Sequence, residues 1–250
     1  MKKTLITLLA LSSIAMADLT DGLQWAESFG DGFDKAPTIT LNGKFIESKG
    51  VGSATSEGGR VSATDLSGGN FTDSFTFSFE LVDLDANKWT NAFTMYTHGS
   101  DEGDNVLQIQ MSNTGNLMVY TGGFTGSNVI DDASNFSLGK VDDLKGKQIT
   151  LTMGTVGDNT VLTGYVDGVA ISDTVTFTYA EGVTPSKAIT GFKFGSQIGD
   201  GRGSNSVTVD NIYLWNRALS ATEVAMIPEP TTATLSLLAL AGLAARRRRK

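Results

Sequence analysis

Four segments of the chain alternate apolar and polar residues with a period of two. The apolar positions are Phe75, Phe77, Phe79 and Leu81; Leu107, Ile109 and Met111; Ile149, Leu151 and Met153; and Val175, Phe177 and Tyr179. The residues between them are polar, among them Thr76, Ser78, Glu80, Gln108 and Gln110. Because successive side chains of a strand point to opposite faces, the pattern predicts strands with one buried face and one polar face.

Two turn signals indicate how these strands are joined. Asp167-Gly168 separates residues 165–166 from residues 169–171, and Asp-Gly tolerates the positive φ angles of a type I′ hairpin turn. Residues 113–116, Asn-Thr-Gly-Asn, are predicted to turn Val106–Met111 back onto Leu117–Tyr120. About a dozen such strands at intervals of roughly ten residues predict a single all-β domain, an antiparallel two-sheet sandwich.

One helical signal lies near the end of this domain. Ser220-Ala221-Thr222-Glu223 has the spacing of a capping box, in which Ser220 and Glu223 each bond the other's backbone amide. Leu219 and Val224 occupy the two positions of a hydrophobic staple. The sequence therefore predicts a strand over Val207–Trp215 followed by a short helical turn.

Composition excludes several classes of function. The chain of 250 residues has no cysteine, so it is neither a disulfide-stabilised protein nor a lipoprotein with an acylated cysteine. The formal charge is −8, but the two termini hold seven of the 19 cations and one of the 27 anions, so residues 18–227 carry −14. A domain this acidic repels phosphate backbones, and nucleic acid is not an expected partner.

The N-terminus has the three parts of a secretory signal peptide. Met1-Lys2-Lys3 is basic, Leu5–Ile14 is apolar, and Ala15-Met16-Ala17 is a small-residue cleavage site. We expect residues 1–17 to be removed by signal peptidase between Ala17 and Asp18. The alternative is a buried N-terminal helix.

The C-terminus has the composition of a short membrane helix. Residues 231–245 carry no charge, and five cations follow: Arg246, Arg247, Arg248, Arg249 and Lys250. At ~1.5 Å per residue this segment is roughly 22 Å long, against a hydrocarbon core of ~30 Å, so it spans only with local thinning or snorkelling. The basic cluster is expected on the cytoplasmic side, with the domain outside.

Residues 228–250 resemble the PEP-CTERM sorting tail of exosortase substrates. The resemblance rests on Pro228-Glu229-Pro230, the uncharged segment and the terminal basic cluster, in that order. It implies recognition in the inner membrane, processing near Pro228, Glu229 and Pro230, and release of the domain to the cell surface or extracellular matrix. The alternative is an ordinary single-pass anchor that keeps its tail.

Residues 18–227 resemble laminin-G-like, concanavalin A-like domains. Asp210–Ser220, with Glu223 after it, is similar to their closing strand and turn, and Gly164–Val169 to the preceding hairpin. Residues 75–81 are similar to their early core strand. The resemblance implies a jelly-roll sandwich of two antiparallel sheets, a fold that often recognises carbohydrate or protein.

The sequence offers no convincing catalytic residues. Glucanases of this fold use two carboxylates on one face of a strand. Glu80 and Asp83 are three residues apart and are expected on opposite faces, while Asp83 and Asp85 are expected in a loop after the strand. The one histidine, His98, has no motif around it, and there is no cysteine nucleophile.

Acidic loops leave a calcium site open as a possibility. The acids that stand in glycine-rich segments are Asp31, Asp34, Asp101, Glu102, Asp104, Asp131, Asp132 and Asp200. Calcium accepts six to eight oxygen ligands in tolerant geometry. None of these groups has EF-hand spacing, and acidic loops also serve simply to keep a surface soluble, so no ligand is assigned.

Sugar recognition would require an exposed aromatic side chain that stacks on a pyranose. Trp89, between Asn87-Lys88 and Thr90-Asn91, is the candidate, with Tyr120 or Phe124 as partner. The alternative is that Trp89 closes an edge of the sandwich. Trp215 lies in a predicted strand and is expected in the core.

The sequence favours an exported, non-catalytic protein that recognises extracellular polysaccharide or another extracellular partner. The alternative is a structural envelope or biofilm component without a specific ligand. A glycoside hydrolase would require a carboxylate pair that the sequence does not supply.

Overall fold

The computed structural model describes residues 19–29, 34–35, 41–47, 54–63, 74–85, 90–96, 105–121, 135–156, 159–178, 191–194 and 206–227. Thirteen strands lie in these ranges: β1 Leu23–Glu27, β2 Leu41–Glu47, β3 Ala54–Ala63, β4 Phe75–Asp85, β5 Thr90–Tyr96, β6 Asn105–Met111, β7 Asn116–Thr121, β8 Asn135–Lys140, β9 Lys147–Val156, β10 Asn159–Val166, β11 Val169–Phe177, β12 Gly191–Phe194 and β13 Ser206–Trp215. Two helical turns accompany them, α2 Val141–Leu144 and α4 Ala221–Val224.

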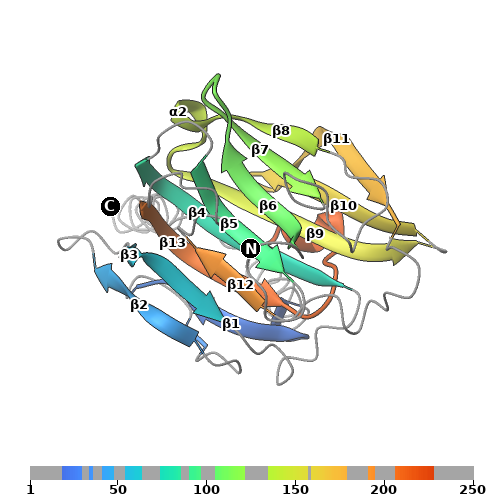
Figure 1. Ribbon diagram of the computed structural model, residues 1–250. Coiled ribbons are helices and arrows are strands. Elements are labelled where there is room, and N and C mark those ends of the chain that lie inside the picture. The colour runs from blue at the N-terminus through green and yellow to red at the C-terminus, as the bar shows by residue number, and fades with distance from the viewer. Residues whose placement is uncertain are drawn as a thin grey trace, which may run out of the picture.

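The strands follow one hydrogen-bonded path that folds into two layers (Figure 1). The order along the path is β11-β10-β9-β4-β13-β3-β12-β5-β6-β7-β8, with β1 on β13 and β2 on β3, and these pairings are antiparallel. β3 connects the layers because its start pairs with β13 and its end with β12. The predicted antiparallel sandwich is confirmed. We call the layer with β4 and β13 the first and the layer with β5 and β6 the second.

The main core lies between the layers and is built on aromatic rings. Phe77 of β4 stacks on Phe93 of β5 with ring centroids 4.1 Å apart, and it also contacts Phe194 of β12 at 5.3 Å. These three side chains are fully buried. Aromatic pairs of this geometry add about 0.5–1.5 kcal/mol each to the free energy of burial. The alternating apolar positions of the sequence therefore hold the two layers together.

Both predicted hairpins are confirmed. Asp167 and Gly168 have φ angles of 48° and 72°, as a type I′ turn requires, and Val166 pairs with Val169 across it. Residues 113–116 reverse the chain so that Met111 pairs with Leu117. Close packing also needs glycine on β10, since a Cβ at Gly164 would lie 2.7 Å from the Phe136 ring of β8.

The prediction that β4 has only one buried face was wrong. Thr76 and Ser78 are fully buried, because a second apolar cluster covers the outer face of the first layer. Its members are Leu19, Leu23, Ala26, Tyr165, Tyr213, Trp215, Leu219, Val224 and Ile227. Thr76 Oγ1 donates to the Arg217 carbonyl at 2.9 Å and accepts from the Leu219 amide at 2.8 Å. We call residues 216–227, which cover this face, the strap.

The strap contains the predicted capping box. Ser220 Oγ accepts from the Glu223 amide at 3.3 Å, and the Ser220 amide donates to Glu223 Oε2 at 2.7 Å. Leu219 and Val224 are both buried in the second cluster. Arg217 Nη2 lies 2.7 Å from Glu223 Oε1. Local capping and tertiary packing therefore agree on where the strap turns.

The strap is also bonded to the start of the domain. Trp215 Nε1 donates to the Leu19 carbonyl at 2.7 Å, which confirms the expected core position of this tryptophan. Next to it, the Asn216 amide donates to the Gly22 carbonyl at 2.9 Å and Arg217 Nε to the Asp21 carbonyl at 2.9 Å. The two ends of the domain therefore stabilise each other.

Both predicted targeting segments lie outside the described residues. These are the signal peptide with its Ala17–Asp18 bond, and the tail with Pro228, Glu229, Pro230 and the basic cluster 246–250. Within the described ranges, no helix has the length and hydropathy of a membrane span. Export and sorting therefore stay predictions.

We expect Phe77→Ala to lower the free energy of unfolding by about 3–5 kcal/mol, because it leaves a cavity where three rings meet. Urea unfolding measures this. Val169→Ala, at a side chain that is 69% exposed, is the control and should change it by less than about 0.5 kcal/mol. Equal effects would contradict the assignment of the core.

Acid should weaken the strap through Glu223. Its hydrogen bond with Arg217 lowers its pKa to about 2 from an ordinary 4.5. A carboxyl with a lowered folded pKa stabilises the protein above its unfolded pKa, and this stabilisation is lost as pH falls from 4.5 towards 2. Urea unfolding at pH 7 and pH 3 should show a smaller acid loss in Glu223→Gln than in wild type or in Asp142→Asn, an exposed control. Identical losses of stability in the wild type and both variants would contradict this role of Glu223.

Candidate functional site

A row of polar side chains crosses the outer face of the second layer. Thr94 of β5 pairs with Gln108 of β6, and Gln108 pairs with Tyr120 of β7. Their neighbours Phe93 and Ile109 are buried in the main core, so the row lies on the other face of the layer. We call Thr94, Gln108 and Tyr120 the polar row.

The row is polar yet withdrawn from water. Gln108 is 0% exposed and Thr94 is 3% exposed, whereas the alternation of β6 predicted only one buried face, that of Leu107 and Ile109. Among the described residues, no hydrogen-bond partner is found for the Gln108 carbonyl oxygen, its amide nitrogen or Thr94 Oγ1. Each buried polar group left in this state costs about 1–3 kcal/mol. Such a group requires an explanation, and a bound ligand or water is one.

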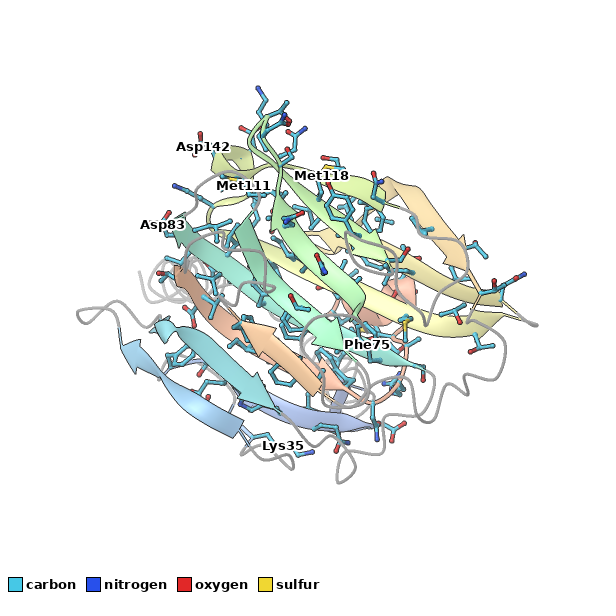
Figure 2. All side chains as sticks on the ribbon, viewed as in Figure 1. Lys35, Phe75, Asp83, Met111, Met118 and Asp142 are labelled. Atoms are coloured by element: carbon cyan, nitrogen blue, oxygen red, sulfur yellow. The ribbon has the colours of Figure 1, made fainter. Side chains whose placement is uncertain are left out.

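An aromatic side chain stands at one end of the row. Tyr120 is half-buried, and burial raises the pKa of its hydroxyl above the usual 10.0. Its hydroxyl is therefore protonated at neutral pH and can both donate and accept. Figure 2 labels Met111 of β6 and Met118 of β7, which lie between the polar row and the β6–β7 turn.

A second polar cluster occupies a bulge on the outer face of the first layer. Asn211 has φ 47°, in the left-handed region that asparagine tolerates, where the pairing of β13 with β4 shifts register. Gln148 of β9 donates through Nε2 to Ser78 Oγ at 2.8 Å and to the Asn211 carbonyl at 3.2 Å. Asn211 Nδ2 donates to Glu80 Oε2 at 3.0 Å. This network of hydrogen bonds holds the bulge in place, so we assign these side chains a structural role.

The acids considered for catalysis are engaged separately. Burial raises the pKa of Glu80, the hydrogen bond from Asn211 opposes this, and the nearby charge of Asp167 adds to it. Asp83 is exposed and lies 2.8 Å from Lys145 Nζ. Figure 2 shows Asp83 near one end of β4 and Phe75 at the other. Each acid therefore has its own partner, and their contacts do not form a carboxylate pair.

Two expectations about Asp83 were wrong. It does not lie in a loop, because β4 continues to Asp85. Its side chain also does not point to the face opposite Glu80. A bulge after Leu81 makes Leu84 the next buried residue of β4, so Glu80 and Asp83 lie on the same face. The bulge depends on pairing with β13, which local alternation does not reveal.

The proposed calcium acids fall mostly outside the described residues. The exception is Asp34, whose Oδ1 accepts from the amide and the hydroxyl of Ser28 at 2.8 Å each. In the described ranges, no group of three or more His, Asp or Glu side chains is arranged to hold a metal ion. Calcium binding by the loops is therefore an untested prediction.

The predicted sugar-stacking residue, Trp89, and its possible partner Phe124 lie outside the described residues, as does His98. Tyr120, the other partner, is described and belongs to the polar row. Trp25 is buried in the main core, stacked on Phe192 with centroids 6.3 Å apart, so it is not available for sugar. Gln108 was missed because alternation identifies the face of a residue but not whether that face is covered.

Residues 101–222 match the family model of the trans-sialidase C-terminal domain. This segment includes β6 to β13 and therefore Gln108 and Tyr120, but not Thr94. A comparison with curated proteins gives no match.

Several solved structures have the same fold. The binding domain of Paraclostridial Mosquitocidal Protein 1 is 15% identical, with a TM-score of 0.52 and coverage of 83% of this chain and 52% of that chain. Botulinum neurotoxin type C, whose cell entry depends on two ganglioside molecules, is 14% identical, with a TM-score of 0.53 and coverage of 84% and 51%. The binding domain of botulinum neurotoxin DC in complex with SialylT is 11% identical, with a TM-score of 0.51 and coverage of 82% and 50%. The chain thus spans about half the length of the structures it matches, and the likeness concerns the fold.

Two buried glutamines should respond oppositely to the same substitution. Gln108→Met removes an amide that finds no partner among the described residues, so we expect the free energy of unfolding to rise by about 1–3 kcal/mol. Gln148→Met removes two hydrogen bonds and should lower it by about 1–3 kcal/mol. Urea unfolding without ligand measures both. A destabilised Gln108→Met would show that the amide is already satisfied.

Proposed function

We propose that this chain is an exported, non-catalytic recognition domain that binds glycan at the polar row. The observation that carries the proposal is Gln108, a fully buried amide with neither of its polar atoms bonded to any described residue. Natural proteins rarely leave such groups unsatisfied. A ligand that bonds both atoms would recover the free energy that their burial costs.

The chemistry of the row suits a sugar. A glutamine amide offers both a donor and an acceptor, and the Thr94 and Tyr120 hydroxyls offer either, which matches the hydroxyl groups of a glycan. The tyrosine ring adds an apolar surface of the kind that stacks on a pyranose. None of the three side chains carries a charge at neutral pH, so the row itself does not call for an acidic sugar.

The comparisons support a binding role. The matched family model is a C-terminal domain of trans-sialidase, and the similar structures are toxin binding domains, one of them in complex with SialylT. The sandwich is consistent with the jelly-roll of concanavalin A-like domains that the closing strand 210–220 resembles. The polar row offers amide and hydroxyl groups, which suit the binding of a sugar, and this agrees with recognition without catalysis.

Export and sorting complete the proposal. We propose that residues 1–17 direct the chain out of the cytoplasm and that residues 228–250 hold it in the inner membrane for an exosortase-type enzyme. The domain then reaches the cell surface or extracellular matrix, where polysaccharide is available. The support is the order of basic, apolar and small residues at one end and of Pro-Glu-Pro, uncharged and basic residues at the other.

A glycan panel probed with the full chain in mild detergent tests the recognition. The panel includes neutral and sialylated glycans, each with calcium and with chelator. We expect selective binding that Gln108→Met abolishes and Gln148→Met retains, because Gln148 lies on the other layer. Binding would then be lost in the more stable variant and kept in the less stable one, which separates recognition from folding. Unchanged binding by Gln108→Met would refute the site, and no binding by the folded chain would favour a structural role.

A further inference from the structure

The last described residue is held firmly in the domain. Ile227 is 5% exposed, belongs to the second apolar cluster and donates its amide to the Val224 carbonyl at 3.1 Å. Three residues, Pro228, Glu229 and Pro230, separate it from the uncharged segment 231–245. Four Cα steps reach at most about 14 Å. A domain of about 210 residues has a radius of gyration of about 17 Å, so this connection is short relative to the domain.

The point of attachment lies on the outer face of the first layer. Ile227 packs there with Tyr165, Tyr213 and Val224. The polar row lies on the outer face of the second layer, with the main core between them. If residues 231–245 enter a membrane, the short connection keeps the strap side near the bilayer and the polar row away from it.

An apolar tip lies beside the strap. The β10–β11 turn touches the residue that follows α4, since a Cβ at Gly168 would lie 3.0 Å from Ala225 Cα. Val169, the first residue of β11, is 69% exposed, and among the described residues no other large hydrophobic side chain is exposed. We call Gly168, Val169 and Ala225 the hairpin tip.

Ion pairs place two basic side chains beside this tip. Lys147 Nζ lies 2.6 Å from Asp167 Oδ2, and Arg217 Nη2 lies 2.7 Å from Glu223 Oε1. An acidic domain would otherwise be repelled by an anionic leaflet. The strap side therefore combines an exposed apolar residue, paired charges and the attachment point of the tail.

We propose that the hairpin tip contacts the headgroup region of the bilayer that holds residues 231–245, so that the polar row faces away from the membrane. The contact rests on the part of the proposed function that places residues 228–250 in the inner membrane, and its consequence for glycan presentation rests on the part that assigns glycan binding to the polar row. One valine and one alanine give weak contact alone, and the short connection supplies the high local concentration that makes the contact persist.

Lipid quenching of a fluorophore at a single cysteine tests the contact, since the chain has no cysteine of its own. The full chain carries Val169→Cys at the tip or, as control, Asn135→Cys, an exposed residue that pairs with Tyr120 at the edge of the polar row. Each labelled protein is inserted into phosphatidylcholine vesicles with or without lipid-bound nitroxide. We expect quenching at residue 169 to exceed that at residue 135 by at least about threefold, because the tip reaches the interface and the far layer does not.

A third protein isolates the role of the connection. A flexible Gly/Ser insert of 20 residues between Ile227 and Pro228, in the Val169→Cys background, adds a root-mean-square reach of about 25 Å. Quenching at residue 169 should then fall towards the value at residue 135. Equal quenching at both positions, or a chain that does not float with the vesicles, would overturn the proposal. Quenching as expected without glycan binding would refute the glycan-binding part of the proposed function and leave this inference standing.

Discussion

The contact between aromatic rings of the two layers is the interaction on which the rest of this structure depends. Phe77 and Phe93 come from the consecutive strands β4 and β5, whereas Phe194 comes from β12, about a hundred residues later in the chain. β3 allows them to meet because it pairs with both layers. Once the inner faces are joined, each layer has one outer face left. The strap closes one of these faces with a second apolar cluster, and the polar row lies on the other.

The outer faces of the two layers each bury a glutamine, but the two side chains differ in their hydrogen bonds. Gln148 and Gln108 are both withdrawn from water, yet Gln148 Nε2 donates to Ser78 and to the backbone of the Asn211 bulge, whereas neither polar atom of the Gln108 side chain finds a partner in the described part of the chain. Gln148 Oε1 also lacks a partner there, so the contrast lies in the two bonds of the Gln148 amide nitrogen. Bonds of this kind help to specify a structure, and a buried amide without any weakens it. This contrast is the reason for placing recognition on the second layer and architecture on the first.

This arrangement also fits the proposed export and sorting. Residues 228–250 follow Ile227 on the strap side, and the proposed binding face lies on the far side of the core. Recognition would therefore not compete with the bilayer while the tail is in place. The strap is bonded to residues 19–22 at the start of the domain, so a cut beyond Ile227 leaves these contacts intact.

The sequence by itself determined β4, β6, β7, β9, β10, β11 and β13, both hairpins, the capping box and the antiparallel sandwich, because periodicity, turn conformation and capping are local properties. Tertiary structure decided which polar faces are covered. Thr76, Ser78 and Gln108 alternate with apolar residues as solvated residues do, and only contacts from distant segments distinguish burial from exposure. The facing of Asp83 likewise depends on a bulge set by pairing with β13. The candidate site was therefore not predictable, because an amide is unsatisfied only when the rest of the fold has removed it from water.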